Sequence, residues 1–295
     1  MRIHTGLGYF VLKRLDSLMA IGKSRHQAKQ AIRDATDEKL WSVSTGHIHS
    51  YITRDTYQQH ILAFVDWVKA HYPGTTPARL DSHADEWASQ YLRELIEKGR
   101  SPATLATIRS ALRLCFGEEI AASVELPRRS RQAITRSREP VKQDAHFQPQ
   151  HWPQHVLFAQ ATGLRRSEMR DVRVGDISEQ PDGCVQVHVR RGKGGKARDV
   201  TVLAGYEQAV LALLEGRELQ ERLFEHIPKN MDVQSYRRAF AQARYQQQAP
   251  GRGLPPPQAK RLKPGDYDLE AAQEVAESLG HSRRRRGIVL SHYLR

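Results

Sequence analysis

Residues 183–203 read GCVQVHVRRGKGGKARDVTVL, and this stretch decides the fold class. Three valines alternate with polar residues over 185–189, and two more do so over 200–202, which is the period of half-buried strands. The glycine-rich run 192–195 between them supplies a tight turn. The stretch therefore predicts a β-hairpin.

Helical patterns flank this hairpin on both sides. Before it, residues 152–164 are apolar and helical in pattern. After it, helices are expected near 205–225 and 232–247, followed by a loop rich in proline and glycine at 249–268 and one last helix. Residues 148–295 are therefore predicted to form one α+β domain, mostly helical around a small β-sheet.

A second, purely helical domain is predicted over residues 41–125, where three helical patterns are joined by short loops. The first helix is expected to start at Thr53 and the second to be capped by Asp81. The third has Ser101 as its cap and Pro102 at its first position, where the N–H that proline lacks is not needed. The whole chain is thus expected to be mainly α with a small β-sheet.

Two segments lie outside these domains. Residues 1–40 form an N-terminal helical extension, with Ser24 as the cap of its helix. Residues 126–147 form a basic linker that fits either a solvated tether or a chain crossing a phosphate backbone. Its basic side chains are Arg128, Arg129, Arg131, Arg136, Arg138 and Lys142.

The charge of the chain predicts an anionic partner. Lys and Arg number 46 against 33 Asp and Glu, which gives a formal net charge of +13 and a pI near 9.9. Nucleic acid is the commonest partner of such proteins, and an anionic membrane surface is the rival. No apolar run approaches the roughly 20 residues that span a bilayer. We therefore expect a nucleic-acid partner and no membrane.

Cysteine usage and short motifs narrow the class further. Cys115 and Cys184 are too few for a disulfide framework and are expected to be buried, reduced side chains. The first 25 residues lack the pattern of a signal peptide. A cytoplasmic, nucleoid-associated protein is expected. No P-loop, GxGxxG, HExxH or EF-hand pattern occurs, so no metal or cofactor is expected.

The stretch 161–177, ATGLRRSEMRDVRVGDI, carries the first candidate site. Glu168 follows Arg165 by three residues and so shares a helix face with it, which taken alone is an ordinary surface pair. The stretch resembles the turn that bears the first catalytic arginine of the tyrosine recombinases, or phage integrases. The resemblance implies that Arg165 is catalytic and that Glu168 supports it.

The turn of the hairpin adds a second match. Its sequence is similar to the β-turn that bears a catalytic lysine in that family, and the matching residue is Lys193. A lysine on a tight turn can protonate a leaving oxygen in a DNA groove, although a turn lysine is ordinarily just solvated. Lys196 is the neighbouring competitor and is otherwise expected to contact DNA.

The third match departs from the family pattern. The family carries a His-x-x-Arg box, which the stretch 233–245 resembles with Arg237 at the arginine position and Arg238 as the weaker alternative. Gln234 then stands where the family has histidine. Glutamine can hydrogen-bond a phosphate oxygen, but it cannot exchange a proton near neutral pH.

The C-terminal stretch supplies the last two residues. SLGHSR resembles the Leu-Gly-His turn of the family, which makes His281 a hydrogen-bond donor to phosphate. Tyr293, twelve residues later, is the expected nucleophile. This spacing is longer than the family usually shows, and the arginine run 283–286 with Gly287 accounts for the difference as an insertion.

The resemblance implies a complete function. Residues 41–125 would be the core-binding, SAM-like DNA-binding domain, and residues 148–295 the catalytic domain. The enzyme would cut and rejoin double-stranded DNA at attachment sites through a 3′-phosphotyrosyl link, without ATP, as a homotetramer assisted by an accessory DNA-bending protein. The loop at 249–268 is similar to one in integrases of integrative mobile elements, which implies DNA integration.

Two other functions remain open. Gln234 and the long spacing from His281 to Tyr293 favour a catalytically impaired relative that binds DNA as an accessory protein. A relaxing enzyme like the type IB topoisomerases would share the chemistry, although not usually this order of domains.

Overall fold

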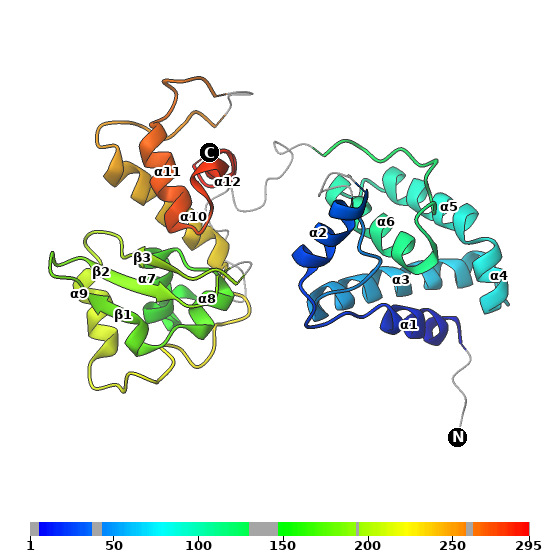
Figure 1. The fold of residues 1–295 in the computed structure, drawn as a ribbon, viewed down its shortest axis with the longest axis horizontal. Helices are drawn as coiled ribbons and strands as arrows, with labels where there is room; N and C mark the ends of the chain where they lie inside the picture. Colours follow the sequence, from blue (N-terminus) through cyan, green and yellow to red (C-terminus); the bar gives the residue numbers. More distant parts are fainter. Residues whose placement is uncertain (1–5, 37–42, 130–146, 193–194, 258–261, 295) are drawn as a thin grey trace. The chain divides into compact units, whose positions relative to one another are not determined.

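The computed structural model describes residues 6–36, 43–129, 147–192, 195–257 and 262–294. The chain divides into two compact units, residues 1–130 and 131–295, which we call unit 1 and unit 2. Unit 1 is helical in its described part, and unit 2 combines helices with one three-stranded sheet (Figure 1). The predicted fold class, mainly α with a small β-sheet, is confirmed.

Unit 1 is built from helices around one apolar core. They are α1 (Leu7–Ser17), α2 (Arg25–Thr36), α3 (Tyr51–His71), α4 (Pro77–Ser82), α5 (Ala84–Glu97) and α6 (Pro102–Phe116). Helix α1 packs against α3 and α6 and buries Leu7, Val11 and Leu15. The sequence pattern predicts that residues 1–40 lie outside the helical domain, but these three side chains are part of the apolar core of unit 1. Helix α2 buries none of its side chains.

Two predicted helix starts in unit 1 are wrong. Helix α3 starts at Tyr51 rather than Thr53, because the side chain of Ser50 accepts a hydrogen bond from the Thr53 N–H and caps the helix. Asp81 caps no helix. It lies in α4 and pairs with Arg14 of α1, with 2.8 Å between Oδ1 and Nη1. The Asp81 carboxylate, which the local sequence pattern predicts to cap a helix, therefore forms an ion pair with a residue distant in the sequence.

Unit 2 places its sheet among short helices. Its elements are η1 (Pro149–His151), α7 (Pro153–Thr162), α8 (Arg166–Asp171), η2 (Val174–Asp176), β1 (Ile177–Glu179), β2 (Val185–Val189), β3 (Arg198–Thr201), α9 (Glu207–Leu211), η3 (Ala212–Leu214), α10 (Val233–Gln248), α11 (Leu269–Ser278), η4 (Arg283–Arg285) and α12 (Arg286–His292). The strand order is β1-β2-β3, antiparallel throughout, with Val187 opposite Val200. The predicted hairpin is present, and β1 adds a third strand.

Two expectations for unit 2 need correction. The helix predicted over 205–225 ends by Leu214, and Gly216 follows with a φ of +70°, a left-handed conformation that stops helices. Cys184 is half-buried rather than buried. Beyond the last helix that the sequence predicts, the structure adds α12, which packs against α11 and buries Val289, with Leu294 buried just after it (Figure 1).

Two findings of absence concern the part of the chain that the structure describes. None of its helices is long and apolar enough to pass through a membrane. None of its clusters of His, Cys, Asp and Glu holds three or more side chains in a position to bind one metal ion.

Candidate active site

Tyr293 is buried in unit 2, but its hydroxyl meets a charged group. The residue follows α12 directly and is 7% exposed. Arg237 Nε donates a hydrogen bond to the Tyr293 hydroxyl at 3.3 Å, and the guanidinium lies 5.6 Å from the centre of the phenol ring. The side-chain amide of Gln242 donates to the Tyr293 carbonyl at 3.1 Å. The ring therefore packs in the core while its oxygen faces a cation.

Arg237, on α10, is a buried cation that joins three segments of unit 2. It is 1% exposed. Its terminal nitrogens donate to the carbonyls of Gly163 and Leu279, each at 2.5 Å. Burial lowers the pKa of Arg237, while the electrostatic effect of Tyr293 opposes this shift. The guanidinium is thus held by neutral acceptors at the junction of α7, α11 and α12.

Arg165 and Arg237 donate hydrogen bonds to the same backbone oxygen, the Leu279 carbonyl. Arg165 precedes α8, and its Nη2 donates to the Leu279 carbonyl at 3.1 Å. Its Nη1 pairs with Glu168 Oε1 at 2.8 Å. Two guanidiniums therefore converge on one neutral carbonyl. Two like charges this close create a local potential that attracts an anion.

Glu168 is the buried counter-charge of this cluster, and Arg198 is its main partner. The side chain of Glu168 is 1% exposed and accepts two hydrogen bonds from the Arg198 guanidinium, both at 2.9 Å. Burial alone would raise the pKa of Glu168, but the hydrogen bonds from Arg198 and from the Arg165 backbone N–H lower it to about 2. The carboxylate is therefore charged at any working pH.

Sequence reasoning missed Arg198, although a signal was present. Side chains two residues apart in a strand point to the same face, so Arg198 shares a face with Val200, which is buried. An arginine on the buried face of a strand needs a buried partner. The same rule predicts a carboxylate facing it, and Glu168 fills this place.

Gln234 and His281 both lie close to Tyr293. A hydrogen bond from the Gln234 side chain helps to lower the pKa of Tyr293. Burial raises that pKa, the charge of Arg237 and hydrogen bonds from Arg237 and Gln234 lower it, and the result is a pKa below the ordinary value. The ring centre of His281 lies 6.2 Å from that of Tyr293. Both residues thus reach the surroundings of the nucleophile expected from the sequence.

Gly163 allows α10 to approach the turn that precedes Arg165. Its φ is +57°, a left-handed conformation that ends α7. A Cβ atom at this position would lie 2.4 Å from a ring carbon of Phe240 on α10. Any larger residue would push apart the two segments that carry Arg165 and Arg237.

Arg166 is a second arginine that the sequence did not single out. Its guanidinium donates to four backbone carbonyls of the segment leading into α10, those of Ile227, Pro228, Lys229 and Met231. It thereby ties the start of α8 to the loop before Arg237. Arg166 therefore helps to fix the position of Arg165, the preceding residue, relative to Arg237 on α10.

Several predicted site residues are not placed in this cluster. Lys193 lies outside the described residues, as do Arg131, Arg136 and Arg138. Lys196 is exposed and lines a hollow of about 440 Å³ together with His281 and Arg198. Arg128 and Arg129 are exposed at the end of unit 1. The roles predicted for these residues stay predictions.

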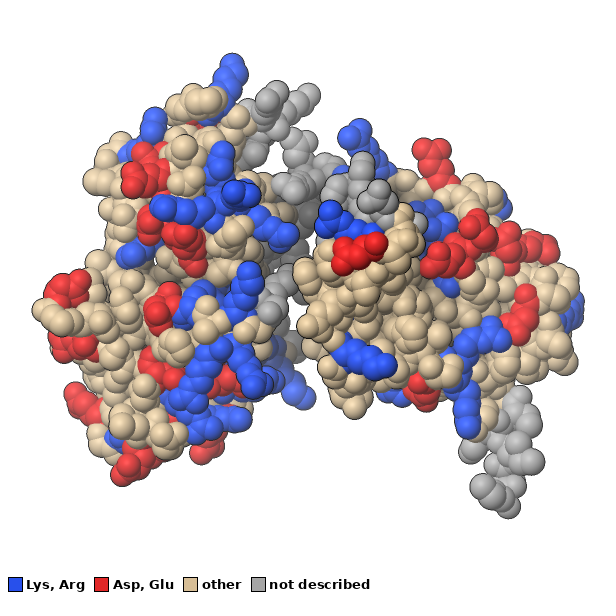
Figure 2. All heavy atoms as spheres, in the orientation of Figure 1, with Lys and Arg blue, Asp and Glu red and all other residues tan. Residues whose placement is uncertain are grey.

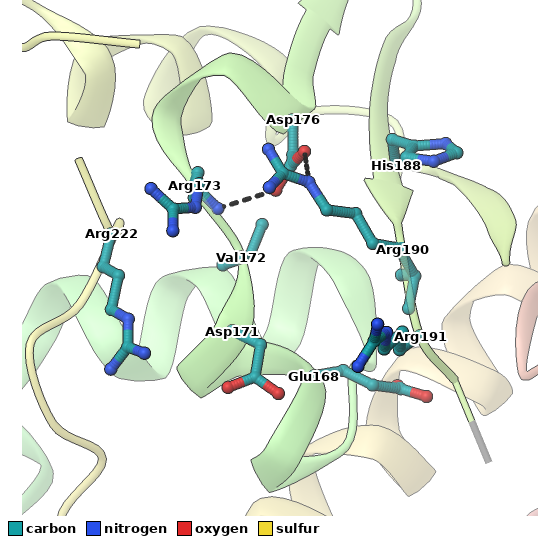
Figure 3. A pocket seen from close by; sticks show the side chains of 10 residues that line it. Glu168, Asp171, Val172, Arg173, Asp176, His188, Arg190, Arg191 and Arg222 are labelled. Atoms are coloured by element: carbon teal, nitrogen blue, oxygen red, sulfur yellow. Dashed lines mark hydrogen bonds and ion pairs between the residues drawn. The ribbon is translucent and has the colours of Figure 1, made fainter. Parts of the chain in front are cut away.

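A second hollow in unit 2 holds an ion pair of similar chemistry. Lys and Arg side chains gather over the part of unit 2 that contains α8 and the sheet (Figure 2). The hollow, of about 350 Å³, lies among them. Arg190 Nε donates to the buried Asp176 carboxylate at 2.7 Å, and the Arg173 N–H donates to its other oxygen at 2.8 Å. Glu168 also lines the hollow but points away from this pair (Figure 3).

Comparisons with known proteins find similarity to solved structures alone. No protein-family model matches the sequence, and no curated protein matches it. The XerH site-specific recombinase bound to palindromic difH substrate, in a post-cleavage complex, is 17% identical over 95% of this chain and 89% of that chain, with a TM-score of 0.49. XerH in a pre-cleavage complex with difH is also 17% identical, over 97% and 92% of the two chains, with a TM-score of 0.48. The XerA recombinase is 15% identical over 96% and 93%, with a TM-score of 0.29. At this level of similarity, we derive the function from the residues of the chain itself.

Proposed function

We propose that this chain is a DNA strand transferase of the tyrosine recombinase type, which cleaves and rejoins double-stranded DNA at specific sites. One observation carries the proposal. Arg165 and Arg237 donate to the same oxygen, the Leu279 carbonyl, and the Tyr293 hydroxyl lies 3.3 Å from Arg237 Nε. A phosphodiester placed there would meet two permanent cations and a phenol oxygen at once.

The chemistry follows from these groups. The Tyr293 oxygen attacks phosphorus and loses its proton to water, while the bond from phosphorus to the 5′ oxygen breaks. Lys193, by its resemblance to the family's catalytic lysine, protonates that leaving oxygen. Arg165 and Arg237 neutralise the charge that builds up on the other phosphate oxygens. The reverse attack by a 5′ hydroxyl rejoins the strand, because the 3′-phosphotyrosyl link preserves the bond.

The partners and setting belong to the same proposal. Basic residues of the linker and Lys196 would contact phosphates, and most of the affinity for DNA would fall with salt. A homotetramer on two attachment sites, an accessory DNA-bending protein and integration of a mobile element follow from the family resemblance. So do the DNA-binding role of the helical unit and a place near the nucleoid in the cytoplasm.

A second candidate function rests on Gln234. Its side chain hydrogen-bonds the Tyr293 hydroxyl but cannot take up the phenol proton. The chain would then be an impaired relative that binds DNA as an accessory protein, with Tyr293 held in place but not used.

A covalent-trapping assay tests the proposal. The protein is incubated with nicked duplexes made from the sequences that flank its gene, and products are resolved under denaturing conditions. We expect a covalent protein–DNA band with wild type and none with Tyr293→Phe. Binding without a band would favour the accessory function. Relaxation of arbitrary supercoiled plasmid would favour the topoisomerase-like enzyme.

A further inference from the structure

Three segments of the candidate active site meet at one side chain that the predicted site did not include. Arg198, at the start of β3, donates to both oxygens of Glu168 at 2.9 Å, and its Nε donates to the Ser278 carbonyl at 3.3 Å. Its side chain is 12% exposed. It therefore connects the hairpin, the start of α8 and the end of α11.

Two motif glycines leave room for this guanidinium. A Cβ atom on Gly192 would lie 2.7 Å from Arg198 Nη1, and one on Gly280 would lie 3.1 Å from Arg198 Cζ. Gly192 belongs to the hairpin turn, and Gly280 directly precedes His281. Both turns thus close against the same group.

The charges explain what Arg198 does for its neighbours. Arg165 is oriented by Glu168 Oε1, which it shares with Arg198 Nη1. Without Arg198, the buried Glu168 would keep hydrogen bonds only from Arg165. Burial is the largest influence on the pKa of Glu168 and acts to raise it, so the loss of the hydrogen bonds and charge of Arg198 would raise that pKa. A protonated Glu168 would hold Arg165 only weakly.

We infer that Arg198 is a positioning residue for strand cleavage: it fixes Glu168, through which it aligns Arg165 with Arg237, and it joins the hairpin to the turn that carries His281. The hydrogen bonds of Arg198 go to Glu168 and to the Ser278 carbonyl rather than to the phenol. The inference rests on the proposed function. The alternative is an ion pair that stabilises unit 2 and has no further effect on cleavage.

The test uses single-turnover cleavage of a nicked duplex at saturating protein, measured from pH 5 to pH 9 with wild type, Arg198→Gln and Arg198→Lys. Melting temperature and DNA affinity are measured for each protein. Arg190→Gln is the matched control, because it removes an arginine from another buried carboxylate, Asp176, in the same unit. Tyr293→Phe is the blank.

We expect Arg198→Gln to lower the cleavage rate at pH 8 about 100-fold, the scale of a misplaced catalytic group, with DNA affinity within about threefold of wild type. Its rate should fall more steeply than the wild-type rate as the pH decreases, because Glu168 would take up a proton in addition to the protonation of Tyr293 that both proteins share. Arg198→Lys should lie between the two, since it keeps the charge but loses the two-pronged contact. Arg190→Gln should cleave like wild type.

Two results would overturn the inference. One is cleavage by both Arg198 variants within about threefold of wild type at every pH. The other is a rate loss that is the same at every pH and that is no larger than the rate loss of Arg190→Gln for the same fall in melting temperature. Such a loss would reflect a less stable fold. If Arg198→Gln does not fold, Arg198→Lys is judged by the same criteria. Failure of wild type itself to cleave would refute the proposed function instead.

Discussion

The pH dependence of stability offers a sharp test of the charge cluster, independent of any DNA site. The perturbation is Glu168→Gln, which keeps the shape of the side chain and removes its charge. The pKa of Glu168 is about 2 in the folded chain against 4.5 for an unperturbed carboxyl. At about 1.4 kcal/mol per pKa unit, this difference contributes about 3 kcal/mol to the stability of unit 2 at neutral pH.

The sign follows from the direction of the shift. A carboxyl whose folded pKa is depressed stabilises the fold above its unfolded pKa, and the contribution is lost as the pH falls towards the folded pKa. Between pH 6 and pH 3, wild type should therefore lose about 2 kcal/mol that comes from Glu168 alone. The variant should lack this component, and its unfolding free energy should change less over the same interval.

Hydrogen exchange measured by mass spectrometry on peptides from α8 and α10 reads out unit 2 separately from unit 1. Glu225→Gln, which removes an exposed carboxyl of the same unit, is the control and should retain the wild-type slope. A wild-type-minus-variant difference that stays constant within about 0.5 kcal/mol from pH 6 to pH 3 would refute the assigned ionisation of Glu168.

Three further predictions concern cleavage of nicked DNA. Arg237→Lys should reduce the single-turnover rate about 10²–10³-fold, since lysine cannot reproduce the planar contact with two oxygens; a smaller loss would argue against a role in the clamp. The wild-type rate should rise with pH towards the lowered pKa of Tyr293, and Arg237→Gln should shift this rise to higher pH, because the charge that lowers the pKa is gone. Gln234→His should raise the rate near neutral pH by supplying a group that exchanges protons; an unchanged or lower rate would show that Gln234 does not occupy the histidine position.

Local sequence rules predicted those parts of the fold that local contacts determine. Ser101 caps α6, with Pro102 in its first turn, because the serine oxygen accepts a hydrogen bond from Thr104 three residues on. The valine alternation fixed β2 and β3 in the same way. Helix α12 was missed because its buried face consists of only a few residues beside an arginine run, and packing against α11 rather than periodicity stabilises it.

The candidate site shows the same division. Arg165 and Glu168 lie three residues apart, so their pairing could be read from helix geometry. The contact of Arg198 with Glu168 spans 30 residues and depends on how β3 meets α8. No local pattern encodes such a contact. The sequence shows only features that accompany the contact: Arg198 lies on the buried face of a strand, and two glycines, Gly192 and Gly280, lie beside its guanidinium.

The contacts of the Leu279 carbonyl indicate how the site would distinguish an incoming phosphate. In the free chain, Arg165 and Arg237 share this one neutral oxygen; Arg165 also donates to Glu168, and Arg237 also donates to the Gly163 carbonyl and the Tyr293 hydroxyl. A phosphate oxygen is charged, and its hydrogen bonds to guanidinium are roughly twice as strong as neutral ones. Binding would therefore exchange a weak shared acceptor for strong ones and release the phenol oxygen from Arg237 in the same step. The buried phenol and the shared Leu279 carbonyl therefore belong to one resting arrangement. In it, these two oxygens occupy guanidinium donors that a bound phosphate would take over.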